Sequence, residues 1–165
     1  MRQDERGFFT RTFCKKELIN YGIDFEVVQC NLSYNKQKGT LRGMHYQSDP
    51  FQEAKMVMCT QGAIYDVIID IRPGSATYKQ WIAVELTAEN HQILYIPKGF
   101  AHGFQTLVDN TMVYYLMSDF YHQQSSCGIR ADDPALNIQW PVSRKIQSEN
   151  DLNLPDFANH VALDY

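Results

Sequence analysis

Short runs of hydrophobic and aromatic residues, each of strand length, recur along the middle of the chain. We expect strands at residues 25–31, 56–60, 63–71, 78–86, 91–96, 104–107 and 111–118. Turn-forming residues separate several of these runs, at residues 35–39, 73–75 and 97–99. Because the strands follow one another without intervening helices, the pattern predicts an all-β sandwich or barrel and not a parallel sheet.

Two short helices are expected outside these strands. Residues 14–21 read as a helix that ends at Gly22, a residue suited to a left-handed C-terminal cap. A second helix is expected at residues 144–150, with Ser143 as its N-cap.

The strand at residues 63–71 carries apolar side chains at both sets of alternating positions, so both of its faces should be buried. A lone carboxylate inside such a strand is costly. Asp66 should therefore border a polar cavity where it finds a partner, or else lie at a solvated strand end. Asp70, next to Arg72 and a turn, is expected at the surface.

Length and composition limit the class of protein. The 165 residues fit one domain, expected to span residues 1–165, and the net charge of −4 provides no general attraction for nucleic acid or anionic lipid. No apolar run is long enough for a membrane span, and the charged residues 1–6 do not resemble a signal peptide, which predicts a cytoplasmic protein. The four Cys residues form no CxxC pair, so we expect reduced, mostly buried thiols.

Two histidines lie among residues that are compatible with a catalytic or metal-binding role. His45 follows Arg42 on a probable strand at residues 39–47, and His102 lies between small residues in the segment 96–104. Either ring can be a structural, hydrogen-bonded residue, a base or a metal ligand. A metal site would need His45, His102 and one acid, because the His-x-His pair of many metal-binding jelly rolls is missing. The remaining histidines, which are expected to be solvated, are His91, His122 and His160.

Tyr115 lies in the strand at residues 111–118, on the same face as Val113 and Met117. A tyrosine at such a position is usually part of the core. The alternative is a proton donor, a role that tyrosine can fill when the acceptor is a strongly basic enolate.

These stretches, taken together, resemble the dTDP-4-dehydrorhamnose 3,5-epimerase family of cupin-like jelly rolls. The resemblance covers nearly the whole chain in collinear order. It is carried by Lys55 and by residues 4–9, 29–31, 41–47, 66–67, 70–72, 96–104, 132–134 and 148–151.

The resemblance implies an all-β, cupin-like jelly-roll barrel with a few short peripheral helices. It also implies a cofactor-independent isomerase that holds no metal and inverts C3 and C5 of a nucleoside-diphosphate 4-keto-6-deoxyhexose. Both carbons flank the C4 carbonyl, so loss of either hydrogen gives an enolate. The enzyme then needs a base on one face of the sugar, an acid on the other and a cation near the oxygen.

The family motifs assign roles to four residues. His45 resembles the base, Asp151 the carboxylate that orients it, Tyr115 the acid on the opposite face and Lys55 the cation that stabilises the enolate. The substrate-binding positions implied in the same way are Arg6, Arg11, Gln29, Asn31, Arg42, Gln47, His102 and Phe120. Among them, Arg42 suits a diphosphate and Phe120 suits stacking on the base.

Three residues depart from the family pattern, namely Arg11, Leu152 and Cys127, and we expect them on the nucleotide side. The nucleotide is therefore open between dTDP, GDP and CDP, and epimerisation at C3 alone or C5 alone is the nearest alternative. The family usually has further residues before the motif at residues 4–9, and its members imply a homodimer. Two other readings are a metal-dependent cupin oxygenase or isomerase and an inactive sugar-binding jelly roll.

Overall fold

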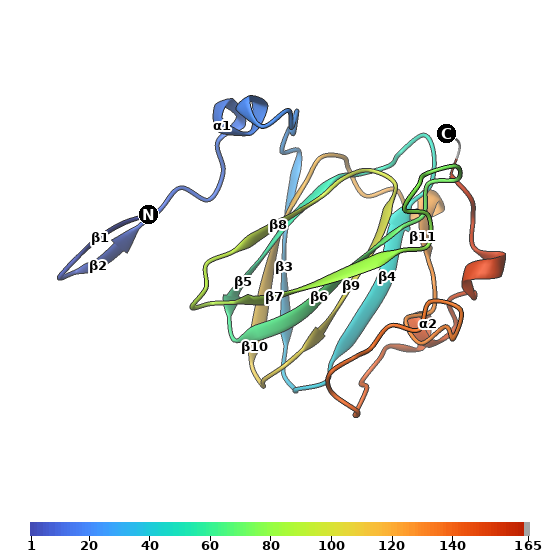
Figure 1. Cartoon of the computed structure of the whole chain (residues 1–165). Helices are drawn as coiled ribbons and strands as arrows, with labels where there is room; N and C mark the ends of the chain where they lie inside the picture. Colours follow the sequence, from blue (N-terminus) through green and yellow to red (C-terminus); the bar gives the residue numbers. More distant parts are fainter. Residues whose placement is uncertain (164–165) are drawn as a thin grey trace.

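The computed structural model describes residues 1–163, and antiparallel strands make up most of it (Figure 1). The strands are β1 (Arg2–Asp4), β2 (Gly7–Phe9), β3 (Gln29–Asn35), β4 (Leu41–Gln47), β5 (Lys55–Gln61), β6 (Ala63–Asp70), β7 (Trp81–Thr87), β8 (Ile93–Ile96), β9 (Phe100–Thr106), β10 (Thr111–Met117) and β11 (Ser126–Gly128). The helical segments are α1 (Lys15–Asn20), η1 (Gln123–Ser125), α2 (Glu149–Leu152) and η2 (Phe157–Asn159). The all-β expectation is confirmed.

Two sheets face each other in the body of the molecule. One has the order β3-β10-β5-β8, and the other has the order β11-β4-β9-β6-β7. Every pairing within them is antiparallel, and partners far apart in sequence lie side by side, as in a jelly roll. The cupin-like fold class implied by the resemblance is therefore confirmed.

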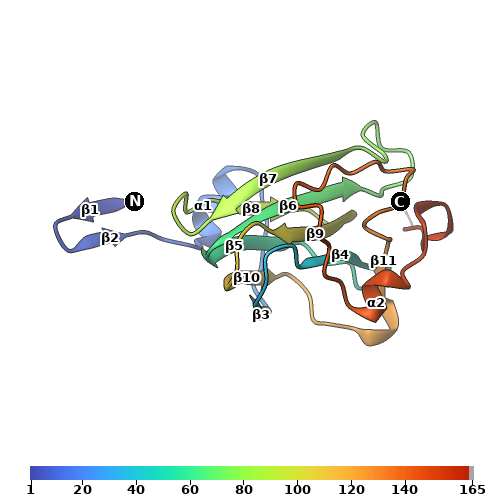
Figure 2. The same ribbon diagram turned by 90° about the horizontal axis from the view of Figure 1, so that it is seen from below.

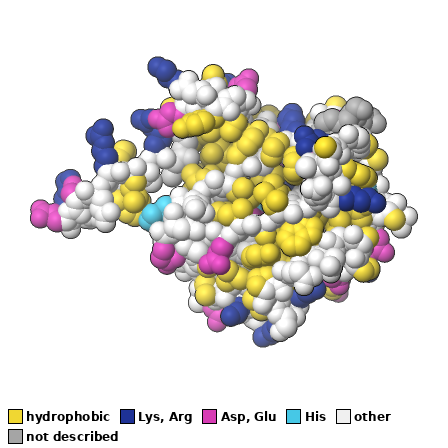
Figure 3. All heavy atoms as spheres, in the orientation of Figure 1, with side chains coloured by type: hydrophobic (Ala, Val, Ile, Leu, Met, Phe, Trp, Pro, Cys, Tyr) yellow, Lys and Arg dark blue, Asp and Glu magenta, His cyan; other side chains and the backbone are white. Residues whose placement is uncertain are grey.

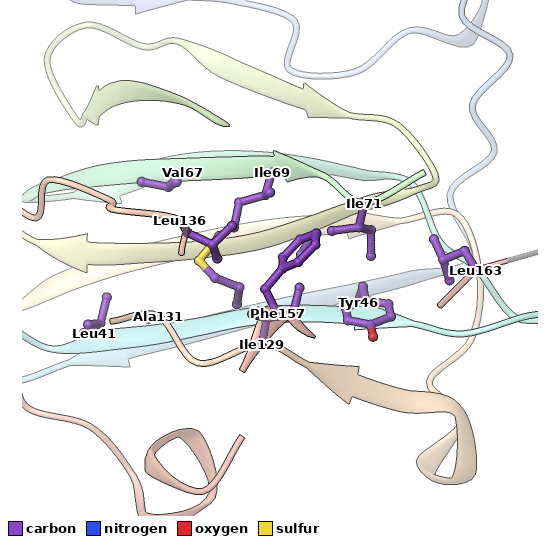
Figure 4. Close-up of a cluster of buried hydrophobic side chains, with 12 residues drawn as sticks. Leu41, Tyr46, Val67, Ile69, Ile71, Ile129, Ala131, Leu136, Phe157 and Leu163 are labelled. Atoms are coloured by element: carbon purple, nitrogen blue, oxygen red, sulfur yellow. The ribbon is translucent and has the colours of Figure 1, made fainter. Parts of the chain in front are cut away.

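The hydrophobic core has two main layers. Val57, Ile68 and Phe104 belong to a fully or nearly buried cluster between the two sheets. A second cluster lies on the outer face of the five-stranded sheet, where side chains from residues 129–163 pack on β4 and β6 (Figure 4). The C-terminal segment therefore covers this sheet (Figure 2).

Strand β6 is buried on both faces, as its sequence predicts. Asp66 points between the sheets, where it is fully buried with His102 as partner, so the expectation that it finds a partner is confirmed. The expectation for Asp70 is wrong. Its carboxylate is 0% exposed and accepts hydrogen bonds from Arg72, Ser75 and Thr77 of the following turn.

The first expected helix is confirmed as α1, but the second is wrong. Residues 144–148 are not helical, because Ile146 pairs with Thr40 and its amide donates to the carbonyl of Gly39. The helix instead starts after Ser148, whose hydroxyl accepts from the amide of Asp151. Pairing with a segment far away in the sequence has overridden the local helix signal.

Other boundaries also moved. The strand expected at residues 25–31 begins at Gln29, and Phe25 before it is buried in a cluster with Met56 and Leu116. The strand expected from residue 78 begins at Trp81, and β9 begins at Phe100, before the expected start. The short strands β1, β2 and β11 were not anticipated from the sequence.

Hairpin β1–β2 projects from the body as an arm (Figure 1). The Phe8 ring lies 4.4 Å from that of His91, measured between centroids. The four cysteines are unpaired, as expected, although only Cys59 is buried. Within residues 1–163, no helix is long and apolar enough to cross a membrane.

Candidate active site

A bulge in β4 aims two candidate residues into one cavity. Arg42 and His45 are three positions apart, so a regular strand would place them on opposite faces. The pairing of β4 with β9 shifts register between them, and both side chains line the same cavity. Bulges of this kind re-aim side chains beside active sites.

Glycine makes this bulge possible. Gly43 has a φ of +116°, and a Cβ added to it would lie 2.6 Å from the Cα of Gly103 on β9. No larger residue fits so close a crossing of two backbones.

The inner cavity lies between the two sheets and has a volume of about 250 Å³. The five-stranded sheet contributes Arg42, His45 and His102, and the four-stranded sheet contributes Lys55 and Tyr115. The other lining residues are Asn31, Ser33, Gly103, Phe104 and Met117. Six residues assigned from the sequence motifs, Asn31 among them, are thus gathered on two opposing walls.

His45 and Asp151 form a hydrogen-bonded pair. Nε2 of His45 lies 2.6 Å from Oδ1 of Asp151, whose side chain is 7% exposed, whereas that of His45 is 46% exposed. Burial by itself would raise the pKa of Asp151, but the hydrogen bond and charge of His45, with Ser148 and Arg42, hold that pKa below its usual value. A carboxylate can only accept, so Nε2 carries the hydrogen and Nδ1 is left with its lone pair.

His102 makes a second pair deeper in the molecule. Its Nε2 lies 2.6 Å from Oδ1 of Asp66, and the two side chains are 5% and 0% exposed. Oδ2 of Asp66 is buried without a hydrogen-bond partner among the described residues. The ring of His102 also meets that of Tyr115 edge-on, with centroids 6.1 Å apart.

Tyr115 stands on β10, on the wall that faces His45. Burial and the charge of Asp66 raise the pKa of Tyr115, while Arg42 opposes the shift. The phenol therefore keeps its proton at neutral pH and can give it to a strong base in the cavity.

Two further polar groups are held in place by neighbours. Nε of Arg42 donates to Oδ1 of Asn35 at 2.8 Å, and Asn35 is itself buried. Gln29 donates to Oδ1 of Asn31 at 3.2 Å. Asn35 was not singled out in the sequence, because it lies in the expected turn at residues 35–39, where an amide gives no signal of what it will orient.

A larger outer cavity, of about 680 Å³, opens from the inner one and shares His45, Lys55 and Asn31 with it. Tyr121 and Asp119 line it, but Phe120 does not. Phe120 is 59% exposed and its backbone amide is bonded to Asp119. Tyr121, missed in the sequence, is thus the aromatic side chain of this segment that meets the cavity.

Gln47 borders the outer cavity, but its side chain is engaged by the protein itself. Its amide nitrogen donates to the carbonyls of Phe51 and Phe120, and its oxygen accepts from the amide of His122. This arrangement ties two loops together at the rim, and leaves little capacity for a ligand.

Arg6 and Arg11, the two candidate arginines of the N-terminal region, do not join either cavity in this chain. Arg6 pairs with Asp4 and its side chain is 85% exposed, and Arg11 pairs with Glu17. Neither lines the inner or the outer cavity.

The remaining candidates lie outside the cavities. His91 is exposed, but His122 stacks on Phe51 at 3.6 Å and His160 is partly buried against Phe157, so the expectation of solvated rings is wrong for these two. Cys127 packs on the core cluster around Tyr46 and lines neither cavity, and Leu152 is 54% exposed.

The metal hypothesis finds no ligand set here. His45 and His102 each bind a different carboxylate, and among residues 1–163 no group of three or more His, Cys, Asp or Glu could hold a metal ion.

Comparison with known proteins identifies relatives of this chain. The family model for dTDP-4-dehydrorhamnose 3,5-epimerase covers residues 1–159. The dTDP-4-dehydrorhamnose 3,5-epimerase of Sinorhizobium fredii is 42% identical over 153 residues, which is 92% of this chain and 78% of the relative.

Two solved structures are similarly close. The Bacillus anthracis dTDP-4-dehydrorhamnose 3,5-epimerase, with TDP and PPi bound, is 45% identical with a TM-score of 0.92, and the match covers 94% of this chain and 89% of that one. A 3′-monoepimerase from Streptomyces bikiniensis, in complex with dTDP-quinovose, is 33% identical with a TM-score of 0.88, over 95% and 80% of the two chains. The chain therefore belongs to the dTDP-4-dehydrorhamnose 3,5-epimerase family, a family of sugar isomerases.

Proposed function

We propose that this chain epimerises C3 and C5 of a dTDP-linked 4-keto-6-deoxyhexose. The observation that carries the proposal is the placement of His45 and Tyr115 on opposing sheets around one cavity, with Lys55 beside them. A sugar ring bound between the sheets would present opposite faces to the two residues.

His45 is the proposed base. With Nε2–H bonded to Asp151, its Nδ1 lone pair accepts the proton from C3 or C5. Asp151 orients the ring and stabilises the imidazolium that forms.

The electron pair left on carbon moves into the ring carbonyl, which gives an enolate with its charge on the C4 oxygen. Lys55 stabilises that charge. Tyr115 then donates its proton to the opposite face of the carbon, and configuration inverts. His45 then releases its extra proton to solvent and Tyr115 takes a proton up from solvent, which restores both groups.

The nucleotide is proposed to occupy the outer cavity, with Tyr121 against the base and Arg42, in the inner cavity, near the diphosphate. The binding of TDP by the Bacillus anthracis relative supports dTDP over GDP or CDP. Gln29, Asn31 and His102 are proposed contacts of the sugar and its linkage.

The experiment is incubation of the dTDP-linked keto sugar in heavy water, with NMR to locate the deuterium. Label at both C3 and C5, with formation of the inverted sugar, is expected. Absence of label at both carbons would overturn the proposal. Label at C3 alone would identify a monoepimerase, the second candidate, which the similarity to the Streptomyces bikiniensis enzyme favours.

We also propose that the chain forms a homodimer. A two-stranded hairpin is only marginally stable alone, yet β1–β2 projects from the body with Phe9 78% exposed. Figure 3 shows hydrophobic side chains on this arm as well as a broad patch across the body. A second copy would cover the arm and bring Arg6 and Arg11 to a cavity.

The oligomer is tested by light scattering of the full chain and of a variant that lacks residues 1–10. We expect a dimer for the first and a monomer for the second, and a monomeric full chain would contradict the proposal. A cytoplasmic location is proposed as well, in keeping with four unpaired cysteines.

A further inference from the structure

We propose that Glu53 is the positioning residue that directs Lys55 at the substrate carbonyl and keeps it from acting as a phosphate ligand. The inference rests on the proposed function. Glu53 drew no attention in the sequence, where it is one acid in a loop between strands.

The two side chains form a buried ion pair. Nζ of Lys55 lies 3.1 Å from Oε1 of Glu53, and the side chains are 8% and 5% exposed. Burying an ammonium without a counter-charge is costly, so Glu53 makes it possible for Lys55 to lie so deep in the cavity.

The geometry leaves Lys55 one donor for a ligand. An ammonium has three N–H groups. One faces Oε1 of Glu53, and a second faces the backbone carbonyl of His45 at 3.3 Å. The third is free for the inner cavity that Lys55 lines with His45 and Tyr115.

The net charge of the Glu53–Lys55 pair determines which ligand group the third N–H of Lys55 can bind well. Glu53 and Lys55 together are neutral, so they offer little to a diphosphate, which prefers an unneutralised cation such as Arg42. A neutral carbonyl that becomes an enolate can still gain from one fixed N–H.

Glu53 also has one carboxylate oxygen that accepts no hydrogen bond in the described part of the chain. This oxygen, Oε2, is buried, although Glu53 borders the outer cavity. As negative charge builds on the enolate, Oε1 of Glu53 and the backbone carbonyl of His45 keep the ammonium of Lys55 in position.

The test compares Glu53→Gln, which keeps the shape and removes the charge, with Glu53→Asp and with Glu85→Gln as an exposed control. We expect Glu53→Gln to lower kcat more than about tenfold, because the aim of Lys55 is lost. Its affinity for dTDP should not fall, because the charge of Lys55 is no longer neutralised and is available to the diphosphate. Glu53→Asp should recover part of kcat, and Glu85→Gln should behave as the parent.

A double-mutant cycle shows whether Glu53 acts through Lys55. In a Lys55→Met background, Glu53→Gln should cause no further loss, since coupled groups are not additive. Additive losses, an unchanged kcat in Glu53→Gln, a weakened dTDP affinity with normal kcat, or unfolding of both Glu53 variants would each overturn the inference. If the parent chain itself shows no exchange in heavy water, the proposed function fails instead.

Discussion

Nε2 of His45 and Oδ1 of Asp151 lie 2.6 Å apart, although 106 positions separate the two residues in the chain. Asp151 is buried below the ring while His45 faces the cavity. We predict that His45→Ala abolishes deuterium exchange at both carbons and that Asp151→Asn lowers kcat by roughly 10²–10⁴-fold, since an amide favours the wrong tautomer. Binding of dTDP, measured by calorimetry, should persist in both. Residual exchange at one carbon in His45→Ala would point to a second base.

Tyr115→Phe should separate the two halves of the reaction. The base remains, so the C–H bond still breaks and solvent deuterium enters recovered substrate, but inversion falls by roughly 10²-fold or more because the donor is missing. NMR of substrate and product pools measures both quantities. Equal loss of exchange and inversion would mean that Tyr115 serves only to shape the cavity.

Tyr121 and Phe120 are adjacent, but only Tyr121 lines the outer cavity. Stacking on a base contributes about 1–3 kcal/mol, so Tyr121→Ala should raise KM roughly tenfold with kcat little changed. Phe120→Ala is the matched control and should leave KM within about twofold of the parent, a change well below that stacking energy. The opposite ranking would show that the loop rearranges on binding.

Gly43 and Gly74 test the bulge in β4. Both have positive φ, but a Cβ at Gly74 meets nothing within 4 Å, whereas one at Gly43 meets the backbone of Gly103 at 2.6 Å. Gly74→Ala should cost about 1 kcal/mol of unfolding free energy. Gly43→Ala should cost more unfolding free energy than Gly74→Ala. It should also lower kcat, because Arg42 and His45 would no longer both point into the inner cavity. Chemical denaturation and steady-state kinetics measure the two effects, and equal costs would contradict the bulge argument.

Asp70 makes stability depend on pH. Burial by itself would raise the pKa of Asp70, but hydrogen bonds from Arg72, Ser75 and Thr77 hold that pKa well below the ordinary value of 3.8. The folded protein thus binds this proton less readily than the unfolded chain. The carboxylate therefore stabilises the fold at pH values above its ordinary pKa, and this stability is lost as the pH falls toward the lower pKa of the folded state.

We therefore predict that Asp70→Asn lowers the unfolding free energy at pH 7 by about 2–4 kcal/mol. The difference in unfolding free energy between the variant and the parent should be smaller at pH 3 than at pH 7, as measured by urea denaturation at each pH. A gap that widens in acid would have the wrong sign for this argument.

Sequence patterns predicted most of the strands in the two main sheets, because the signals for a strand are local in the sequence. Residues 63–71 showed apolar positions on both faces, and β6 is buried on both faces. The cost of a lone buried carboxylate predicted a partner for Asp66, although the pattern did not name His102. Asp70 and residues 144–150 were misread, since their partners lie in a turn and in a segment far away in the sequence.

By itself, the sequence determined the all-β class and the family, and it predicted that His45, Tyr115, Lys55 and Asp151 carry the chemistry. Only the tertiary structure decided their spatial relations. The β4 bulge, the pairing of Glu53 with Lys55 and the choice of Tyr121 over Phe120 depend on strand register and loop packing. A one-residue shift in register turns a side chain to the other face, and register is set by contacts between segments far apart in the chain.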